Sequence, residues 1–145
     1  GSYLLANSDI YSSVIYDKKL IIVVCDNGGH MVINRLQLAK GGKEYICNLR
    51  AARASNLQFV DFEAHAKSMG ANGETVSSTS ELEAAFLRAK KSDKTYVISI
   101  QTDGYKWLDG SAFWESPTLE IPSTEENKVA YKQFIDGKNK QRKGV

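Results

Sequence analysis

The segment with the clearest capacity for chemistry in this chain is Asp26-Asn27-Gly28-Gly29. Its carboxylate and carboxamide offer oxygen ligands, and its two glycines let the backbone turn tightly and come close to a ligand. The segment directly follows Leu20–Cys25, a continuous apolar run that predicts a strand buried on both faces of a parallel sheet. Ligands of open α/β sheets bind just beyond the carboxyl ends of strands. The loop after this strand is therefore the first candidate site.

Helices on both sides of this strand are needed to hold the loop in place. The residues from Leu5 to about Tyr16 predict one helix before the strand, and Ile33–Lys40 predicts another that leads the chain away from the loop. In the first of these, the apolar side is expected to contain Leu5, Ile10, Val14 and Ile15.

The middle of the chain predicts two more helices and two more strands. Asp61 is a plausible N-cap for a helix that ends at Gly70. Ser80 and Glu83 have the spacing of a capping box for the next helix, with Leu82, Ala85, Phe86 and Ala89 on one face and Lys90 and Lys91 near its end. Glu74–Ser77 and Thr95–Gln101 are the strand candidates. Strands that alternate with helices in this way predict a parallel sheet built from β-α-β units.

The remaining segments are less regular. Gly41–Leu57 is expected to be a long loop with one short strand at Tyr45–Leu49, and Thr102–Pro122 is irregular. Ser123 and Glu126 predict a second capping box, opening a helix whose inward residues include Val129, Ala130, Phe134 and Ile135. The basic tail from Gly137 is interpreted as a solvated terminus. Its lysines and arginine have no interleaved aromatic residues, so a nucleic-acid partner is not indicated.

The totals describe one ordinary globular domain. The chain has 145 residues, 42% hydrophobic and 25% charged, with a formal net charge of +2. Cys25 and Cys47 lack the spacing of a disulfide framework or a zinc site, and Cys25 is expected to be a small packing residue in the strand. No apolar run approaches the roughly 20 residues needed to span a bilayer, so no membrane contact is expected and the simplest compartment is the cytoplasm.

The spacing of Gly1-Ser2-Tyr3 and Asp26-Asn27-x-Gly29 resembles the cofactor motif of thiamine-diphosphate-dependent enzymes. That motif begins with Gly-Asp-Gly and closes, some two dozen residues later, with an Asn-Asn or Asp-Asn pair at a strand end. The resemblance makes Gly1 its second glycine and implies that its Asp precedes Gly1. It also implies a three-layer α/β/α fold with a mostly parallel sheet, truncated at its N-terminus. Residues 1–145 would be the C-terminal cofactor-binding domain, with residues 102–145 an extension packed on it.

Within this family the chain is most similar to the hydrolases that open a trihydroxycyclohexane-dione in myo-inositol breakdown. The similarity lies in Gly1-Ser2-Tyr3-Leu4, in Ile33-Asn34-Arg35-Leu36-Gln37 after the Asp-Asn pair, and in Val60–Ser68. It implies a thiamine-diphosphate- and Mg²⁺-dependent hydrolase that cleaves a carbon–carbon bond of a cyclic dione. The complete enzyme would be a homo-oligomer with N-terminal domains that supply the activating glutamate, so the isolated chain is expected to be inactive.

The resemblance also assigns roles to residues of the loop. Asn27 through its side chain and Gly29 through its carbonyl oxygen would ligate Mg²⁺, while Gly1 and Ser2 would offer N–H groups to the diphosphate. His30 and Met31 follow in the cofactor-binding segment, and His30 is the one weak candidate for a catalytic contact. The catalytic groups otherwise remain unassigned.

Plainer interpretations compete with several of these roles. Asn27 could simply close a turn, as Asx side chains often do. His30 could be a surface histidine, and His65 is interpreted as a packed, hydrogen-bonded residue. Arg50 and Arg53 fit a solvated loop face better than a substrate contact, and Trp107 and Trp114 fit packing anchors.

Two other functions remain open at this point. One is an acetolactate-synthase-like or decarboxylating enzyme of the same family, which is expected to lack the Ile-Asn-Arg-Leu-Gln element. The other is a non-catalytic α/β interaction module that has lost cofactor binding. An ordinary dinucleotide-binding domain is disfavoured because no GxGxxG follows any strand.

Overall fold

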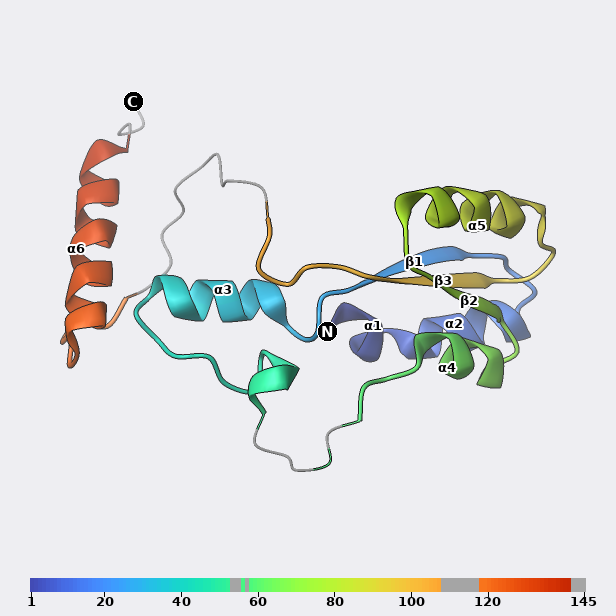
Figure 1. Ribbon diagram of the computed structural model, residues 1–145, viewed down its shortest axis with the longest axis horizontal. Coiled ribbons are helices and arrows are strands. Elements are labelled where there is room, and N and C mark those ends of the chain that lie inside the picture. Colours follow the sequence, from blue (N-terminus) through green and yellow to red (C-terminus); the bar gives the residue numbers. More distant parts are fainter. Residues whose placement is uncertain (53–55, 57, 108–117, 142–145) are drawn as a thin grey trace. The chain divides into compact units, whose positions relative to one another are not determined.

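A computed structural model of the chain describes residues 1–52, 56, 58–107 and 118–141. The described residues divide into two compact units, one within residues 1–29 and 54–103 and the other within residues 30–53 and 104–145. The first unit contains the sheet and the helices α1, α2, α4 and α5 (Figure 1). The second contains α3, a short 3₁₀ helix and α6.

The sheet of the first unit has three parallel strands. They are β1 (Ile21–Asp26), β2 (Asn72–Val76) and β3 (Tyr96–Gln101), in the order β1-β3-β2. Both β1 and β2 pair with β3 in parallel, and Ser99 is the partner of Val24 on one side and of Thr75 on the other. Because all three strands are parallel, their carboxyl ends lie at one edge, as the sequence predicts.

Helices cover both faces of this sheet, which confirms the three-layer α/β/α architecture. On one face α1 (Ser2–Leu5), α2 (Asn7–Ile15) and α4 (Phe62–Ser68) lie below the strands, and on the other face α5 (Thr79–Lys91) lies above them (Figure 1). Two apolar clusters fill these layers. The first contains Ile10, Val24, Ala66, Ala71 and Val97, and the second contains Val76, Ala85, Ala89, Ile98 and Ile100.

The expectation that β1 is buried on both faces is wrong. Within the described residues β1 has a neighbour on one side only, whereas β3 is central and its Val97 and Ile98 are fully buried. Val23 is 39% exposed and Cys25 is exposed, so Cys25 is not the packing residue that the sequence suggests. An apolar, β-branched composition does not by itself tell an edge strand from a central one.

The helix before β1 differs in detail from its prediction. It is divided at Ala6 into α1 and α2, and its apolar side is narrower than expected. Ile10 is buried, but Leu5 is 83% exposed and Ile15 is 58% exposed. Only the residues that face the sheet find apolar partners there.

Helix boundaries in the middle of the chain are partly confirmed. The side chain of Asp61 accepts a hydrogen bond from the Ala64 N–H at 2.9 Å, which makes it the N-cap of α4 as predicted. Gly70 follows the helix with a φ of +87°, a left-handed conformation that favours glycine. The cap of α5 is Ser78, whose Oγ accepts from the Glu81 N–H, and not Ser80. The capping box Ser78–Glu81 has the same spacing two residues earlier.

In the second unit, α3 spans Met31–Ala39 and begins two residues earlier than predicted. The strand expected at Tyr45–Leu49 is wrong: Ile46 and Cys47 form a turn, and a 3₁₀ helix, η1 (Leu49–Ala51), begins at the end of this range, capped by the Asn48 side chain. The last helix, α6 (Glu125–Lys140), is capped by Thr124, one residue after the predicted Ser123. It continues through Gly137, where the sequence predicts the start of a solvated tail. None of the described helices is long and apolar enough to cross a membrane.

Candidate functional site

The loop after β1 is a tight turn closed by its own side chains. Asp26 Oδ1 accepts a hydrogen bond from the Gly28 N–H at 3.0 Å, and Asn27 Oδ1 accepts one from the Gly29 N–H at 3.3 Å. Gly28 has a φ of +82° and Gly29 a φ of +154°, conformations that glycine adopts without the strain of a Cβ. The two glycines are thus required by the path of the backbone.

The carboxamide of Asn27 therefore closes an Asx turn, which is the simpler of the two roles considered for this residue. The same residue also lines a pocket at the end of β1. A carboxamide oxygen has two lone pairs, and the turn uses one of them in a bond at the long end of the normal range. A second lone pair on the same oxygen is chemically able to bind a ligand.

The two ends of the sequence motif meet at this turn. The backbone nitrogen of Gly1, the amino terminus of this chain, donates to the Gly29 carbonyl oxygen at 3.4 Å, although 28 positions separate the two residues. The carbonyl oxygen of Gly29 therefore faces the start of α1. This contact places Gly1, Ser2 and Asn27 around one hollow.

That hollow is a pocket of about 360 Å³ that lies wholly within the first unit. Its polar part comes from the start of α1 and from the loop, and its apolar part comes from β1 and from the rings of Tyr3 and Phe62. The lining residues are Gly1, Ser2, Tyr3, Ile22, Val23, Val24, Cys25, Asp26, Asn27 and Phe62. A pocket with an apolar wall and a few convergent polar groups fits a small-molecule ligand.

His30 and Met31 belong to the second unit and are described there. His30 is the N-cap residue of α3, and its exposed side chain makes no cap hydrogen bond. Its backbone N–H donates to the Cys47 carbonyl at 2.7 Å. Met31 is buried, with only 3% of its surface exposed.

His65 is half-buried and hydrogen-bonded, as the sequence predicts. Its Nδ1 lies 2.9 Å from the hydroxyl oxygen of Tyr3, and the two rings meet edge to face with their centroids 5.6 Å apart. His65 does not line the pocket, but its partner Tyr3 does. The sequence alone provides no signal for a pair separated by 62 positions.

The second unit also contains a polar cluster that the sequence does not predict. The Glu44 Oε1 atom accepts hydrogen bonds from Asn34, Asn48 and Tyr105, at 2.8, 3.3 and 2.8 Å. The bonds from Asn34 and Tyr105 hold the pKa of the Glu44 carboxyl below its ordinary value. Asn34 is fully buried and its Oδ1 has no partner among the described residues. The order of amino acids gave no signal for this cluster, since Glu44 and Tyr105 are separated by 61 positions.

The remaining candidates are structural or lie outside the described residues. Arg50 is exposed. The guanidinium of Arg35 lies 4.7 Å from the centroid of the Trp107 ring, which supports a packing role for that tryptophan. Arg53 and Trp114 lie outside the described residues.

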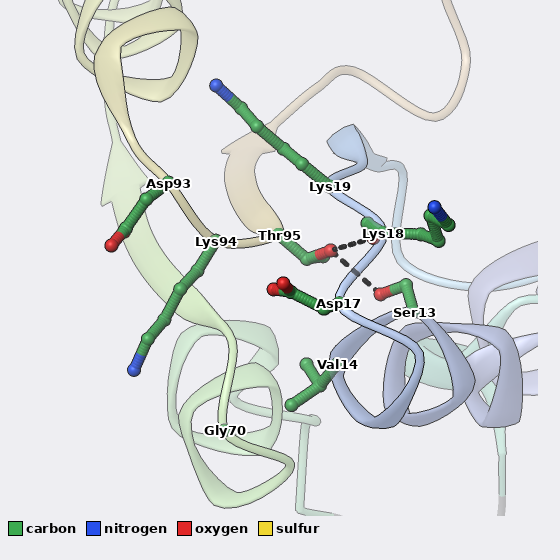
Figure 2. A pocket seen from close by; sticks show the side chains of 9 residues that line it. All are labelled: Ser13, Val14, Asp17, Lys18, Lys19, Gly70, Asp93, Lys94 and Thr95. Atoms are coloured by element: carbon green, nitrogen blue, oxygen red, sulfur yellow. Dashed lines mark hydrogen bonds between the residues drawn. The ribbon is translucent and has the colours of Figure 1, made fainter.

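A second hollow of about 90 Å³ lies at the amino ends of the strands (Figure 2). Its buried polar groups already have partners: Ser13 Oγ lies 2.7 Å from Thr95 Oγ1, which also donates to the Lys18 carbonyl at 3.2 Å and accepts from the Leu20 N–H at 3.0 Å. Lys19 and Lys94 extend away from the hydroxyl pair (Figure 2). These bonds join α2, β1 and β3, so the cluster supports the fold.

The described residues contain no group of three or more histidine, cysteine, aspartate or glutamate side chains arranged to hold a metal ion. A magnesium site built on a carboxamide and a main-chain carbonyl is of a different kind, because Mg²⁺ is usually held by few protein groups together with ligand phosphates. The Asn27 side chain and the Gly29 carbonyl are compatible with such a site.

The fold, the turn after β1 and the pocket beside it define a cofactor-binding α/β domain. The chain belongs to the thiamine pyrophosphate enzymes: residues 1–100 match the C-terminal TPP binding domain of that family. Three similar proteins are all named 3D-(3,5/4)-trihydroxycyclohexane-1,2-dione hydrolase. They come from Halalkalibacterium halodurans, Bacillus licheniformis and Bacillus subtilis, and are 36%, 32% and 31% identical over 90%, 91% and 90% of this chain.

The chain spans only 21% of the length of each of these three proteins. No solved structure matches the chain significantly.

Proposed function

We propose that this chain is the cofactor-binding part of a thiamine-diphosphate- and Mg²⁺-dependent hydrolase that cleaves a carbon–carbon bond of a cyclic 1,2-dione in inositol catabolism. The observation that carries the proposal is the contact between the Gly1 nitrogen and the Gly29 carbonyl, beside the pocket that Asn27 lines. It unites the two ends of the cofactor motif. The names of the similar hydrolases support the choice of substrate class.

In this proposal the loop after β1 binds the diphosphate end of the cofactor. Asn27 Oδ1 and the Gly29 carbonyl oxygen bind Mg²⁺, which in turn neutralises the diphosphate. The main-chain N–H groups of Gly1 and Ser2 would donate to phosphate oxygens, and His30 and Met31 are proposed as further cofactor-binding residues. An amide at position 27 provides an oxygen ligand without adding negative charge next to a diphosphate.

The bound cofactor supplies a thiazolium carbon that adds to carbonyl groups. This chain's residues orient it: the turn holds the diphosphate, and the rings of Tyr3 and Phe62 form an apolar wall of the pocket. The proposal assigns the activating glutamate to N-terminal domains of the same protein, in a homo-oligomeric enzyme of the cytoplasm. Residues 102–145 are proposed to be an extension of the cofactor-binding domain.

The test is a calorimetric titration of the chain with thiamine diphosphate, with and without MgCl₂. Saturable binding that requires the metal is expected. Absence of binding would contradict the proposal and favour a non-catalytic interaction module, to which the Asx turn of Asn27 also conforms.

A second measurement addresses the activity. The isolated chain is expected to show no cleavage of trihydroxycyclohexane-dione in the presence of thiamine diphosphate and MgCl₂. Turnover by this chain alone would show that no other domain is needed and would contradict that part of the proposal.

A further inference from the structure

Tyr3 is both a wall of the candidate cofactor pocket and a link to a neighbouring helix. Its half-buried ring packs edge to face on Phe62, with ring centroids 4.8 Å apart and an interplanar angle of 78°. Both rings line the pocket. Tyr3 follows directly after Gly1 and Ser2, so contacts to its ring anchor the segment that contains those two residues.

The hydroxyl of Tyr3 is held by His65, in the middle of α4. The oxygen lies 2.9 Å from Nδ1 of the imidazole. Burial raises the pKa of the Tyr3 phenol, which therefore keeps its proton near neutral pH. A protonated phenol can donate to Nδ1 when the imidazole carries its own proton on Nε2. Phe62 and His65 thus hold the same ring from two positions of one helix.

Helix α4 is a firm support for this contact. Asp61 caps it, and Ala66 is fully buried between the helix and the sheet. A Cβ added at Gly73 of β2 would lie 2.9 Å from the Glu63 carbonyl oxygen, so the helix and the strand pack too closely to admit a side chain there. A side chain on α4 therefore has a well-defined position relative to β1 and the loop.

We infer that His65 is a positioning residue for the cofactor pocket: through its hydrogen bond to Tyr3 it holds the Gly1–Tyr3 segment against the loop after β1. The inference rests on the proposed function, because the pocket is taken to receive thiamine diphosphate. A hydrogen bond that only stabilised the fold would affect unfolding and leave the affinity for the ligand unchanged. The two roles are therefore separated by measuring both quantities.

The experiment compares His65→Leu, His65→Asn, Tyr3→Phe and the Tyr3→Phe/His65→Leu double variant. For each, the Kd of thiamine diphosphate at saturating MgCl₂ is measured by calorimetry, and the free energy of unfolding is measured in urea. We expect His65→Leu and Tyr3→Phe each to raise the Kd about tenfold, as the loss of one well-placed hydrogen bond allows. The double variant is expected to match the single variants, since all three lack the same bond.

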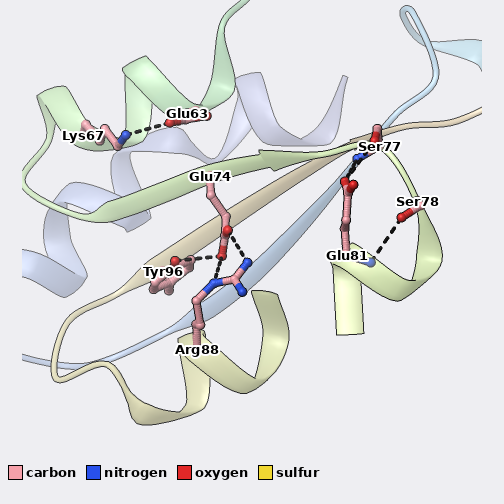
Figure 3. A network of polar contacts seen from close by, with 8 residues as sticks. All are labelled: Glu63, Lys67, Glu74, Ser77, Ser78, Glu81, Arg88 and Tyr96. Carbon is pink, nitrogen blue, oxygen red and sulfur yellow. Dashed lines mark hydrogen bonds and ion pairs between the residues drawn. The ribbon is translucent and has the colours of Figure 1, made fainter. Parts of the chain in front are cut away.

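Two further variants make the comparison specific. In His65→Asn the carboxamide replaces the imidazole near Nδ1, and the Kd is expected to return to within about twofold of the unchanged chain. Tyr96→Phe is the matched control: its hydroxyl donates to Glu74 Oε1 at 2.8 Å, on the opposite face of the sheet (Figure 3). This variant should lose stability without a change in Kd.

The possible results are distinct. If His65→Leu and Tyr3→Phe reduce the free energy of unfolding but leave the Kd unchanged, His65 has only a structural role and the inference is wrong. If His65→Leu does not fold, Tyr3→Phe, which retains the ring, decides the question. If the unchanged chain does not bind thiamine diphosphate, both the proposed function and the inference are overturned.

Discussion

Asn27 combines two tasks in one carboxamide. Its Oδ1 closes the turn onto the Gly29 N–H, and its side chain lines the pocket next to Gly1. Aspartate would keep the short reach to the backbone but add a negative charge, and glutamine would keep the neutral amide oxygen but lengthen the reach. The residue is thus the natural target for testing cofactor binding.

Asn27→Ala should therefore weaken metal-dependent binding of thiamine diphosphate at least tenfold, with a loss of about 1 kcal/mol in the free energy of unfolding from the turn hydrogen bond. Calorimetry and urea titration measure the two effects. Asn72→Ala is the control, because Asn72 Nδ2 donates to Ser92 Oγ at 3.0 Å at the amino end of β2. Asn72→Ala should lower the free energy of unfolding and leave the affinity for thiamine diphosphate unchanged. An unchanged affinity in Asn27→Ala would remove this residue from the site.

A second prediction at the residue scale concerns Gly41, between α3 and the loop that follows. Its φ is +75°, and an added Cβ would lie 2.6 Å from the backbone carbon of Glu126. Asn127 Nδ2 donates to the carbonyls of Lys40 and Gly41, each at 3.1 Å, so the two backbones are tied together at this point. The Gly41→Ala substitution is expected to cost about 2 kcal/mol or more, from left-handed strain and the backbone clash.

The matched control for that substitution is Gly137→Ala. Gly137 lies inside α6, where alanine is favoured over glycine by up to about 1 kcal/mol. Thermal unfolding should show a lower Tm for Gly41→Ala and a higher one for Gly137→Ala. Equal effects of the two changes would show that Gly41 is not held in its strained conformation.

At the scale of single elements, two serines near the start of α5, Ser78 and Ser80, have different roles. Ser78 Oγ accepts from the Glu81 N–H at 3.2 Å, while the carboxylate of Glu81 accepts from the Ser77 N–H at 2.8 Å (Figure 3). Ser80 lies in the first turn and provides no backbone cap. We expect Ser78→Ala to reduce the free energy of unfolding by about 1 kcal/mol and Ser80→Ala by less than about 0.5 kcal/mol. A larger loss of stability in Ser80→Ala than in Ser78→Ala would show that Ser80 caps the helix, as the sequence predicts.

The two edges of the sheet differ in chemical character. The β2 edge has Glu74, which pairs with Arg88 at 2.6 Å and accepts from Tyr96 (Figure 3). At the other edge, β1 consists mainly of consecutive apolar residues, and one of them, Val23, is 39% exposed. Charged groups discourage pairing between sheet edges, whereas an apolar edge favours it.

The chain is therefore expected to self-associate through β1. Light scattering over a range of concentrations should show a rising mean mass, and Val23→Lys should reduce it. Thr75→Lys, at an exposed position of β2, is the corresponding control and should have little effect. A monomer at all concentrations would contradict this prediction.

For the molecule as a whole, five glutamates make the free energy of unfolding depend on pH in the same direction. Hydrogen bonds hold the pKa of each carboxyl below its ordinary value of 4.5; for Glu74 the largest cause is the Arg88 guanidinium, and for Glu63 it is the Lys67 ammonium. The others are Glu44, Glu81 and Glu126. A depressed pKa in the folded chain stabilises it above the pKa of the unfolded chain, and this stabilisation is lost as the pH falls through the folded value.

The urea midpoint is thus expected to fall as the pH is lowered from about 4.5 toward 3. Glu74→Gln should reduce the steepness of this fall, since it removes one of the contributing carboxyls. Glu83→Gln, at an exposed position of α5, serves as the charge-matched control. A Glu74→Gln profile parallel to that of the unchanged chain would show that the Arg88 contact adds nothing to the acid sensitivity.

Much of this protein could be predicted from its sequence. The alternation of helices and parallel strands follows from local periodicity, and the cofactor motif follows from residues at fixed spacing, such as Asn27 and Gly29. Asp61 and Gly70 mark helix ends through bonds and backbone angles within a few residues. Features of this kind depend on near neighbours, which the order of amino acids specifies directly.

The tertiary structure decided what depends on distant partners. It made β3 central and β1 an edge strand, which their similar compositions do not distinguish. It also joined Gly1 to Gly29 and Tyr3 to His65 across 28 and 62 positions. The physical reason is that burial and hydrogen bonding are fixed only when the layers pack, so the same apolar or polar residue becomes core, edge or site according to what packs against it.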